Sequence, residues 1–217
     1  MFGDLTWVQH YLGSNKPTNG TKSSQIKQQA KIIVDGLSNS DEFYSKINNL
    51  YHYGKTFEDL ALAAAIFGRG QKFRQNFKLN YLYDWLGYTV GWAEVDSLCQ
   101  NNFFPDELLA TWPKWSRFLI KLSQDKNIHR RRASLVLLCK SLGKSDDVRF
   151  LNLAFDNISR LYSEKEVLIS KAISWVLRSA VKNHPLAIKK YLEVHRDILP
   201  KIAYRETLKK LTTGKKN

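Results

Sequence analysis

The stretch KAISWVLRSAVKNHP, Lys171–Pro185, determines the fold class because apolar residues recur in and just before it at intervals of three and four. This spacing is typical of one face of an α-helix. The face comprises Ile169, Ala172, Ile173, Val176, Leu177 and Ala180. A second helical face carries Lys171, Trp175, Arg178 and Lys182. Trp175 therefore lies among cations, and it either packs over their aliphatic stems or belongs to a contact surface for an anionic, aromatic ligand.

The same periodicity continues along the chain and predicts an all-α protein, since no run alternates cleanly enough for a strand. The predicted helices cover residues 3–13, 22–37, 41–51, 56–68, 72–86, 92–101, 105–123, 127–142, 146–162, 164–183, 185–197 and 200–212. Residues suited to N-caps precede several of them, namely Ser40-Asp41, Thr56 with Asp59, Asn127, and Ser163 followed by Glu166.

A repeat of about 40 residues relates the later helices. Trp92 and Arg132 are 40 residues apart, and Arg132 and Lys171 are 39 apart. Such a period predicts a curved solenoid of HEAT-like antiparallel helix pairs, forming a single domain over residues 1–217. The second helix of each pair would line the concave side. One strip would then carry Trp92, Asp96, Arg132, Lys171, Trp175 and Arg178.

The charge of the chain favours a polyanionic partner. There are 34 Lys and Arg residues against 20 Asp and Glu, a formal net charge of +14. This excess fits nucleic acid or an anionic membrane surface, and charge alone does not choose between them. No stretch has the roughly 18 apolar residues of a membrane-spanning helix, and the first residues lack the apolar centre of a secretory signal. We therefore expect a cytoplasmic protein, nucleoid-associated if bacterial, with a frayed basic tail over 209–217.

The cysteines and histidines indicate neither a disulfide framework nor a metal site. Cys99 and Cys139 lie in apolar helical surroundings, which predicts two buried thiols. The five histidines show none of the close His or Cys spacings of metal ligands. We expect no metal and no cofactor.

Two motifs suggest a nucleic-acid site. In TVGWAEVDSL, Trp92 and Asp96 are four residues apart and share a helical face, a pattern that is common on solvated helices. In NIHRRRAS, His129 and three arginines open an otherwise buried helix. Arginine forks bind phosphate oxygens in pairs, but they also pair with carboxylates or helix C-termini of neighbouring repeats. Both interpretations of these arginines stay open.

The segments GWAEVDS (Gly91–Ser97), NIHRRRAS (Asn127–Ser134) and SKAISWVLRSAVKNHP (Ser170–Pro185) resemble the three signature regions of the AlkD-like alkylpurine DNA glycosylases, DNA alkylation-repair proteins with HEAT-like repeats. Their order and separation also match, and the similarity extends from about residue 85 to 212. The resemblance implies that Trp92, Asp96 and Trp175 form the catalytic trio and that Arg132 lies beside the DNA backbone. Gly91 and Ala93 depart from the family's usual pattern.

The resemblance further implies a monofunctional glycosylase that hydrolyses the N-glycosidic bond of N3- or N7-alkylated, cationic purines in duplex DNA. It would leave an abasic site and act without full base flipping. Its partner would be double-stranded DNA carrying alkylated purines, with no membrane and no obligate protein partner. Phosphate contacts are expected from Arg131, Arg132, Lys171, Arg178 and Lys182.

Two other functions fit the same residues. One is a non-catalytic HEAT-like scaffold that binds DNA or structured RNA through a basic concave face. The other is an adaptor for an acidic protein. Release of a base from alkylated DNA would distinguish the glycosylase from the scaffold and from the adaptor.

Overall fold

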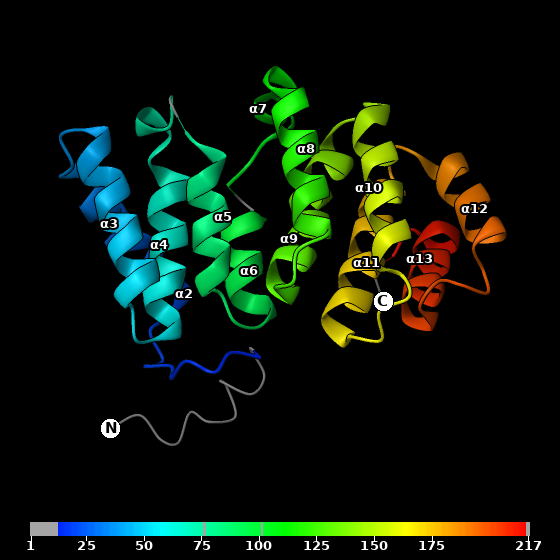
Figure 1. Cartoon of the computed structure of the whole chain (residues 1–217), viewed down its shortest axis with the longest axis horizontal. Coiled ribbons are helices and arrows are strands. Elements are labelled where there is room, and N and C mark those ends of the chain that lie inside the picture. Colours follow the sequence, from blue (N-terminus) through cyan, green and yellow to red (C-terminus); the bar gives the residue numbers. More distant parts are fainter. Residues whose placement is uncertain (1–12, 76, 101, 216–217) are drawn as a thin grey trace. The chain divides into compact units, whose positions relative to one another are not determined.

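The computed structural model describes residues 13–75, 77–100 and 102–215, and every regular element in these ranges is helical (Figure 1). The predicted all-α fold of packed helix pairs is confirmed. Most of the helix predicted over residues 3–13 lies outside the described residues. The chain divides into two compact units, Met1–Asn102 and Phe103–Asn217. The single domain expected over 1–217 stays a prediction.

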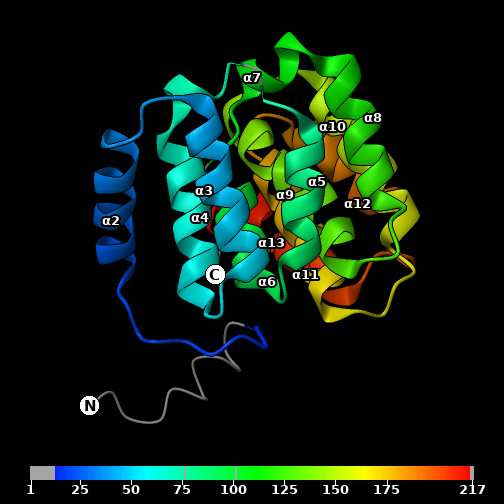
Figure 2. The same cartoon turned by 60° about the vertical axis from the view of Figure 1, so that its left-hand side comes forward.

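The first unit contains α2 (Ser23–Asp35), α3 (Ser40–Tyr53), α4 (Phe57–Arg69), the 3₁₀ helix η1 (Gln71–Phe73), α5 (Leu79–Tyr88) and α6 (Trp92–Cys99). α4 is its centre, because α2, α3 and α6 all pack against it. Phe43, Phe67 and Trp85 are fully buried in an aromatic core, and the Trp85 indole N–H donates to Asn48 at 2.7 Å. Figure 2 shows the extended segment before α2 running along one end of these helices.

The second unit contains α7 (Pro105–Ala110), α8 (Trp112–Ser123), α9 (Ile128–Lys144), α10 (Val148–Leu161), α11 (Val167–Ala180), α12 (Pro185–Val194) and α13 (Lys201–Thr213). α9 is buried from Arg132 to Cys139, because α8, α10 and α11 all pack against it. α11 also packs against α13. Arg132 and Lys171 are each the fifth residue of their helix, as the 39-residue spacing predicts. The equivalence of Trp92, the first residue of α6, stays a prediction.

Two predicted helices are interrupted. The helix predicted over 105–123 is divided at Thr111 (φ −133°, ψ 40°), because Pro113 has no N–H to continue the hydrogen-bonding ladder of α7. The helix predicted over 72–86 is interrupted after its first residues. Only the short η1 forms there, and α5 starts at Leu79. Between them the guanidinium of Arg74 turns inward. It donates to the Asn102 carbonyl at 2.7 Å and lies 4.1 Å from the ring centre of Phe67.

The helix ends show which capping predictions hold. Thr56 and Asp59 form a capping box at α4, and Asn127 caps α9. Asn39, rather than Ser40-Asp41, caps α3. The prediction for Ser163 is wrong, because α11 begins only after Glu166.

At the C-terminal end, α13 extends to Thr213 and so includes the first residues of the basic tail, while fraying over 209–217 stays a prediction. Gly214 stops the helix in a left-handed conformation (φ 69°), with its N–H bonded to the Lys210 carbonyl.

Candidate functional site

Trp92 and Asp96 lie one turn apart on α6, and both are half-buried. α6 begins directly after Gly91, whose backbone (φ 84°, ψ 176°) is in a region open essentially to glycine alone. A Cβ at Gly91 would lie 2.1 Å from the carbonyl oxygen of Gly13. The departure of Gly91 from the family pattern therefore has a structural reason: the backbone of residue 13 occupies the place of a side chain.

The segment Gly13–Thr21, which we call the strap, lies against the start of α6. Gly13 also has a positive φ of 64°, and a Cβ placed on it would lie 3.4 Å from Cδ1 of Trp92. The backbones of Gly13 and Gly91 thus approach each other beside the indole. This contact limits where the ring of Trp92 can lie.

Glu94 anchors one end of the strap. Its side chain is 2% exposed and accepts hydrogen bonds from the Ser14 hydroxyl and the Val90 amide. Burial raises the pKa of Glu94, although these two hydrogen bonds and the nearby charge of Lys16 act in the opposite direction. The carboxylate holds together the strap and the residues that begin α6.

Glu58 anchors the other end of the strap. It accepts hydrogen bonds from the Thr18 hydroxyl and from the amides of Asn19 and Gly20, at 3.1 and 3.0 Å. Between the two anchors, the Pro17 carbonyl accepts from the Phe57 amide at 2.9 Å. Sequence reasoning missed the strap, because its partners lie about 40 and 80 residues further along the chain.

In the second unit, Arg132 is buried, with 3% of its surface exposed. Its Nη1 donates to the Leu168 carbonyl at 2.7 Å, just inside the start of α11. The guanidinium therefore links α9 to α11. It is a fixed positive charge rather than a mobile surface group.

Arg131 has the carboxylate partner that the sequence left open as an alternative. Its Nη2 donates to Glu164 Oε2 at 3.0 Å, and its Nε lies 2.8 Å from Oε1. Its Nη1 donates to the carbonyls of Asp125 and Lys126, both at 2.8 Å. This pairing also explains why α11 starts late, since Glu164 is held in the loop that follows α10.

His129 lies beside these arginines. Burial, and then the positive charges of Arg132 and Arg131, lower the pKa of its imidazole. Its Nδ1 is buried and has no hydrogen-bond partner in the described part of the chain. The neutral ring is thus the form that the fold favours.

The cationic face predicted for α11 is only partly solvent-facing. Lys171 is exposed and Trp175 is half-buried, which leaves part of the indole accessible. Arg178 is held from both sides: its Nε donates to the Ser174 hydroxyl at 3.1 Å, and its Nη2 lies 3.5 Å from Glu206. Lys182 is exposed and follows α11 in a turn rather than lying on the helix.

The structure thus places Trp92 with Asp96 in the first unit. It places Arg131, Arg132, Lys171, Trp175, Arg178 and Lys182 in the second. That both sets line one strip stays a prediction. An accessible carboxylate beside an indole can stabilise a cationic group. Exposed lysines can bind phosphate.

Cys99 and Cys139 are buried, as predicted. Across the described ranges, no cluster of three His, Cys, Asp or Glu side chains is arranged to hold a metal ion. None of the described helices has the length and apolar character needed to span a bilayer.

A sequence profile described as DNA alkylation repair enzyme matches residues 4–211. The chain belongs to this family. The family assigns it a role in DNA alkylation repair as an enzyme, with DNA as its substrate. No curated protein matches the chain.

Among solved structures, the chain is similar to a predicted DNA alkylation repair enzyme from Enterococcus faecalis. The TM-score is 0.78 at 19% identity, covering 96% of this chain and 94% of the other. At that identity the similarity demonstrates a shared fold.

Proposed function

We propose that the chain is a monofunctional DNA glycosylase that releases N3- or N7-alkylated purines from duplex DNA and leaves an abasic site. The observation that carries this proposal is the pair Trp92 and Asp96 on adjacent turns of α6 in a member of the alkylation repair family. Both side chains are half-buried, so each keeps part of its surface for a substrate.

The chemistry needs only one carboxylate. Glycosidases that cleave ordinary sugars use two carboxyl groups, because an acid must protonate the departing oxygen. A purine alkylated at N3 or N7 already carries a positive charge. When its bond to C1′ breaks, the electron pair moves to the ring nitrogen and the base leaves as a neutral molecule. No acid is needed to assist this departure.

Asp96 is the catalytic residue of the proposal. As the base leaves, positive charge develops on the sugar, and a carboxylate beside it lowers the energy of that state. Asp96 also orients a water molecule, whose oxygen bonds to C1′ and whose proton passes to solvent. The products are the free base and an abasic site. We assign no lysine nucleophile, so the DNA strand stays intact.

Trp92 and Trp175 hold the alkylated nucleotide in the proposal. An indole face attracts a cationic ring by about 0.5–2 kcal/mol, depending on how much water is excluded. This favours the lesion over a neutral base by at most tens-fold. The remaining selectivity comes from the leaving group, because an unmodified purine departs much more slowly. We propose that the lesion reacts without full rotation out of the duplex.

Lysines provide the adaptable phosphate contacts in this proposal. Lys171 and Lys182 are exposed, so they are our first candidates. Arg132 and Arg178 act as fixed charges beside the backbone, because protein groups already orient both guanidiniums. We leave Arg131 out, since its donors face Glu164 and two carbonyls. Binding should therefore weaken steeply with salt.

The test measures the bases released from globally methylated DNA by mass spectrometry. We expect the natural chain to release N3-methyladenine or N7-methylguanine. Asp96→Asn should lower the rate of release by at least about 100-fold. Asp156→Asn, an exposed carboxylate on α10, is the matched control and should retain the full rate. Asp96→Asn should bind the DNA nearly as well as the natural chain.

The non-catalytic scaffold gives a different result in the same assay. It releases no base, and Trp175→Ala weakens binding to undamaged and methylated DNA alike. If Asp96→Asn releases the base as fast as the natural chain does, Asp96 is not the catalytic residue.

A further inference from the structure

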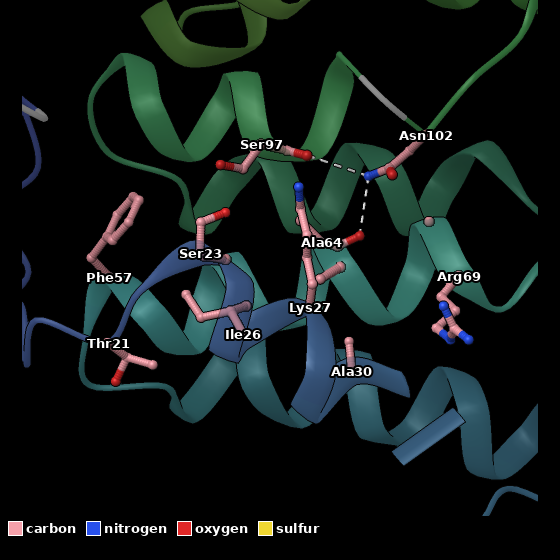
Figure 3. Close-up of a pocket in the computed structure, with 13 residues that line it drawn as sticks. Thr21, Ser23, Ile26, Lys27, Ala30, Phe57, Ala64, Arg69, Ser97 and Asn102 are labelled. Atoms are coloured by element: carbon pink, nitrogen blue, oxygen red, sulfur yellow. Dashed lines mark hydrogen bonds between the residues drawn. The ribbon is translucent and has the colours of Figure 1, made fainter. Parts of the chain in front are cut away.

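A cavity of about 530 Å³ lies within the first unit, between α2, α4 and α6 (Figure 3). Its volume falls among those of small-molecule sites, about 300–1,000 Å³. Ile26 and Ala30 of α2 form one wall. Ala61 and Ala65 form the floor on α4, where small side chains leave room for a flat group, and Gly68 lines the end of the cavity. The proposed catalytic residues do not line it, although Ser97, which does, directly follows Asp96 on α6.

The cavity ends at a fixed polar group. Asn102 is 4% exposed, and its amide nitrogen donates to the carbonyls of Leu98 and Ala64 at 2.8 and 3.2 Å. These bonds orient the side chain so that Oδ1 lies over Gly68, only 2.2 Å from where a Cβ would be. No described residue donates a hydrogen bond to this oxygen. Oδ1 is therefore an acceptor that faces no protein donor, and a ligand that carries an N–H can bond to it.

Two cations from different helices complete the lining. In Figure 3, Lys27 extends from α2 towards Ser97, while Arg69 lies at the end of α4, on the side of Asn102. Neither makes an ion pair or a hydrogen bond with any described residue. An adjoining cavity of about 420 Å³ shares Gly68 and Arg69 and adds Lys72 together with the carboxylate of Asp35. The cations Lys27, Arg69 and Lys72 outnumber this one carboxylate, so the lining of the two cavities still suits an anionic ligand.

We propose that this cavity binds an unpaired, unmodified nucleotide of DNA. The phosphate pairs with Lys27 and Arg69, the base lies on the Ala floor of α4, and an N–H of the base donates to Asn102 Oδ1. DNA is the polyanion on which the family acts, and an apolar slot beside unpaired cations matches a base joined to a phosphate. A cationic alkylpurine would be repelled by the same two side chains. The site is therefore separate from the one proposed around Asp96.

This proposal does not depend on glycosylase activity, because any role on DNA could use the site. The probe is 2-aminopurine deoxyriboside 5′-monophosphate, titrated into the full chain and followed by its fluorescence. The nucleoside without phosphate and inorganic phosphate are the two reference ligands. A second arm uses an oligonucleotide duplex with 2-aminopurine opposite an abasic analogue, which separates a nucleotide within DNA from a free one.

We expect the nucleotide to bind at least about tenfold more tightly than the nucleoside. Lys27→Ala and Arg69→Ala should each weaken binding about threefold to tenfold. Lys190→Ala, an exposed cation on α12, is the matched control and should bind as the natural chain does. Because all three residues are exposed, these variants should fold. Asp96→Asn should retain nucleotide binding even where it loses base release, so failure of one proposal is distinguishable from failure of the other.

Three results would overturn the proposal. One is no saturation of either arm below about 10 mM, the range of very weak ligands. Another is equal binding of the nucleoside and the nucleotide. The third is inorganic phosphate competing as well as the unlabelled nucleotide, which would indicate an anion site without a base pocket.

Discussion

The two units hold their candidate residues with opposite kinds of charge. In the first, the buried carboxylates Glu58 and Glu94 accept hydrogen bonds from the strap and fix it beside Trp92. In the second, Arg131 and Arg132 donate to a carboxylate and to carbonyls on neighbouring helices and loops. Arg178 donates to the Ser174 hydroxyl on its own helix and lies 3.5 Å from Glu206 of α13. Carboxylates suit a loop, whose free groups are amides and hydroxyls. Guanidiniums suit backbone carbonyls and carboxylates, which are the acceptors that Arg131 and Arg132 find.

This difference changes how the net charge should be understood. The formal charge of +14 suggests a broad cationic surface. Three of the arginines that open or line the signature regions are committed to internal partners. The exposed lysines, such as Lys171 and Lys182, are left as the adaptable DNA-facing cations.

The largest effect is expected where the strap meets α6. Gly91→Ala adds a Cβ 2.1 Å from the Gly13 carbonyl at a φ of 84°, and it should lower the free energy of unfolding by about 3 kcal/mol or more. Gly143→Ala on α9 is the matched control, because outside its own helix backbone the nearest atom to the added Cβ is the Ser179 carbonyl oxygen, 4.0 Å away. It should change stability by no more than about 1 kcal/mol, in the stabilising direction. Denaturant titration followed by circular dichroism measures both, and equal values would refute the close contact.

The next effect tests the arginine side of the comparison. Arg131→Ala leaves Glu164 and two carbonyls without their donor, and it should cost about 1–3 kcal/mol in the free energy of unfolding. Lys165→Ala removes an exposed neighbouring cation and should stay within about 0.5 kcal/mol. The same denaturant titration compares them. If Arg131→Ala leaves the free energy of unfolding unchanged, Arg131 is again a candidate for a phosphate contact.

Lys171→Ala should affect DNA rather than stability. If Lys171 contacts a phosphate, the variant weakens binding about equally for all sequences and reduces the slope of log K against log salt by about one. Arg131→Ala, assayed at a temperature where it is folded, should leave that slope unchanged. Titrations of a fluorescent duplex at several salt concentrations measure both slopes. An unchanged slope for Lys171→Ala would exclude this contact.

The smallest effect is the response to pH. His129 has a pKa below 6.5 in the fold, so unfolded chains take up its proton first, and stability is lost as pH falls below 6.5. Glu94 has a pKa above 4.5 in the fold, so its contribution has the opposite sign: stability rises as pH falls towards 4.5.

His129→Gln should remove the loss of stability below pH 6.5, which is under the limit of about 1.4 kcal/mol per pH unit for one proton. Unfolding titrations between pH 7 and 5 measure it. A slope identical to that of the natural chain would show that His129 is not the group responsible.

Periodicity predicted most helices because apolar spacing is a local property. Periodicity failed where a single residue interrupts the helical backbone, or where a side chain bonds to a residue far along the chain. Pro113 divides a continuous apolar pattern into α7 and α8. Arg74 turns inward to a carbonyl 28 residues away, which no local pattern signals.

The site was predictable in its residue types but not in their partners. The spacing of Trp92 and Asp96 predicted their shared face on one helix, and α6 carries both residues one turn apart. Nothing near Arg131 in the sequence indicates that Glu164, 33 residues later, pairs with it. The strap was missed for the same reason, since Ser14 and Glu94 are 80 residues apart. Polar pairs close in sequence, such as Thr56 and Asp59, are predictable, whereas partners tens of residues apart are not.

The strap also bears on how this protein should be shortened or fused. Its residues have the composition of a dispensable linker, yet Asn19 and Gly20 have their amides occupied and Pro17 its carbonyl. A protease needs several consecutive residues of accessible backbone, so cleavage within the strap should be slow. A version trimmed to the start of α2 would leave two buried carboxylates without their strap donors. A shortened version should therefore keep the strap from Gly13 onward rather than begin at the first helix of the unit.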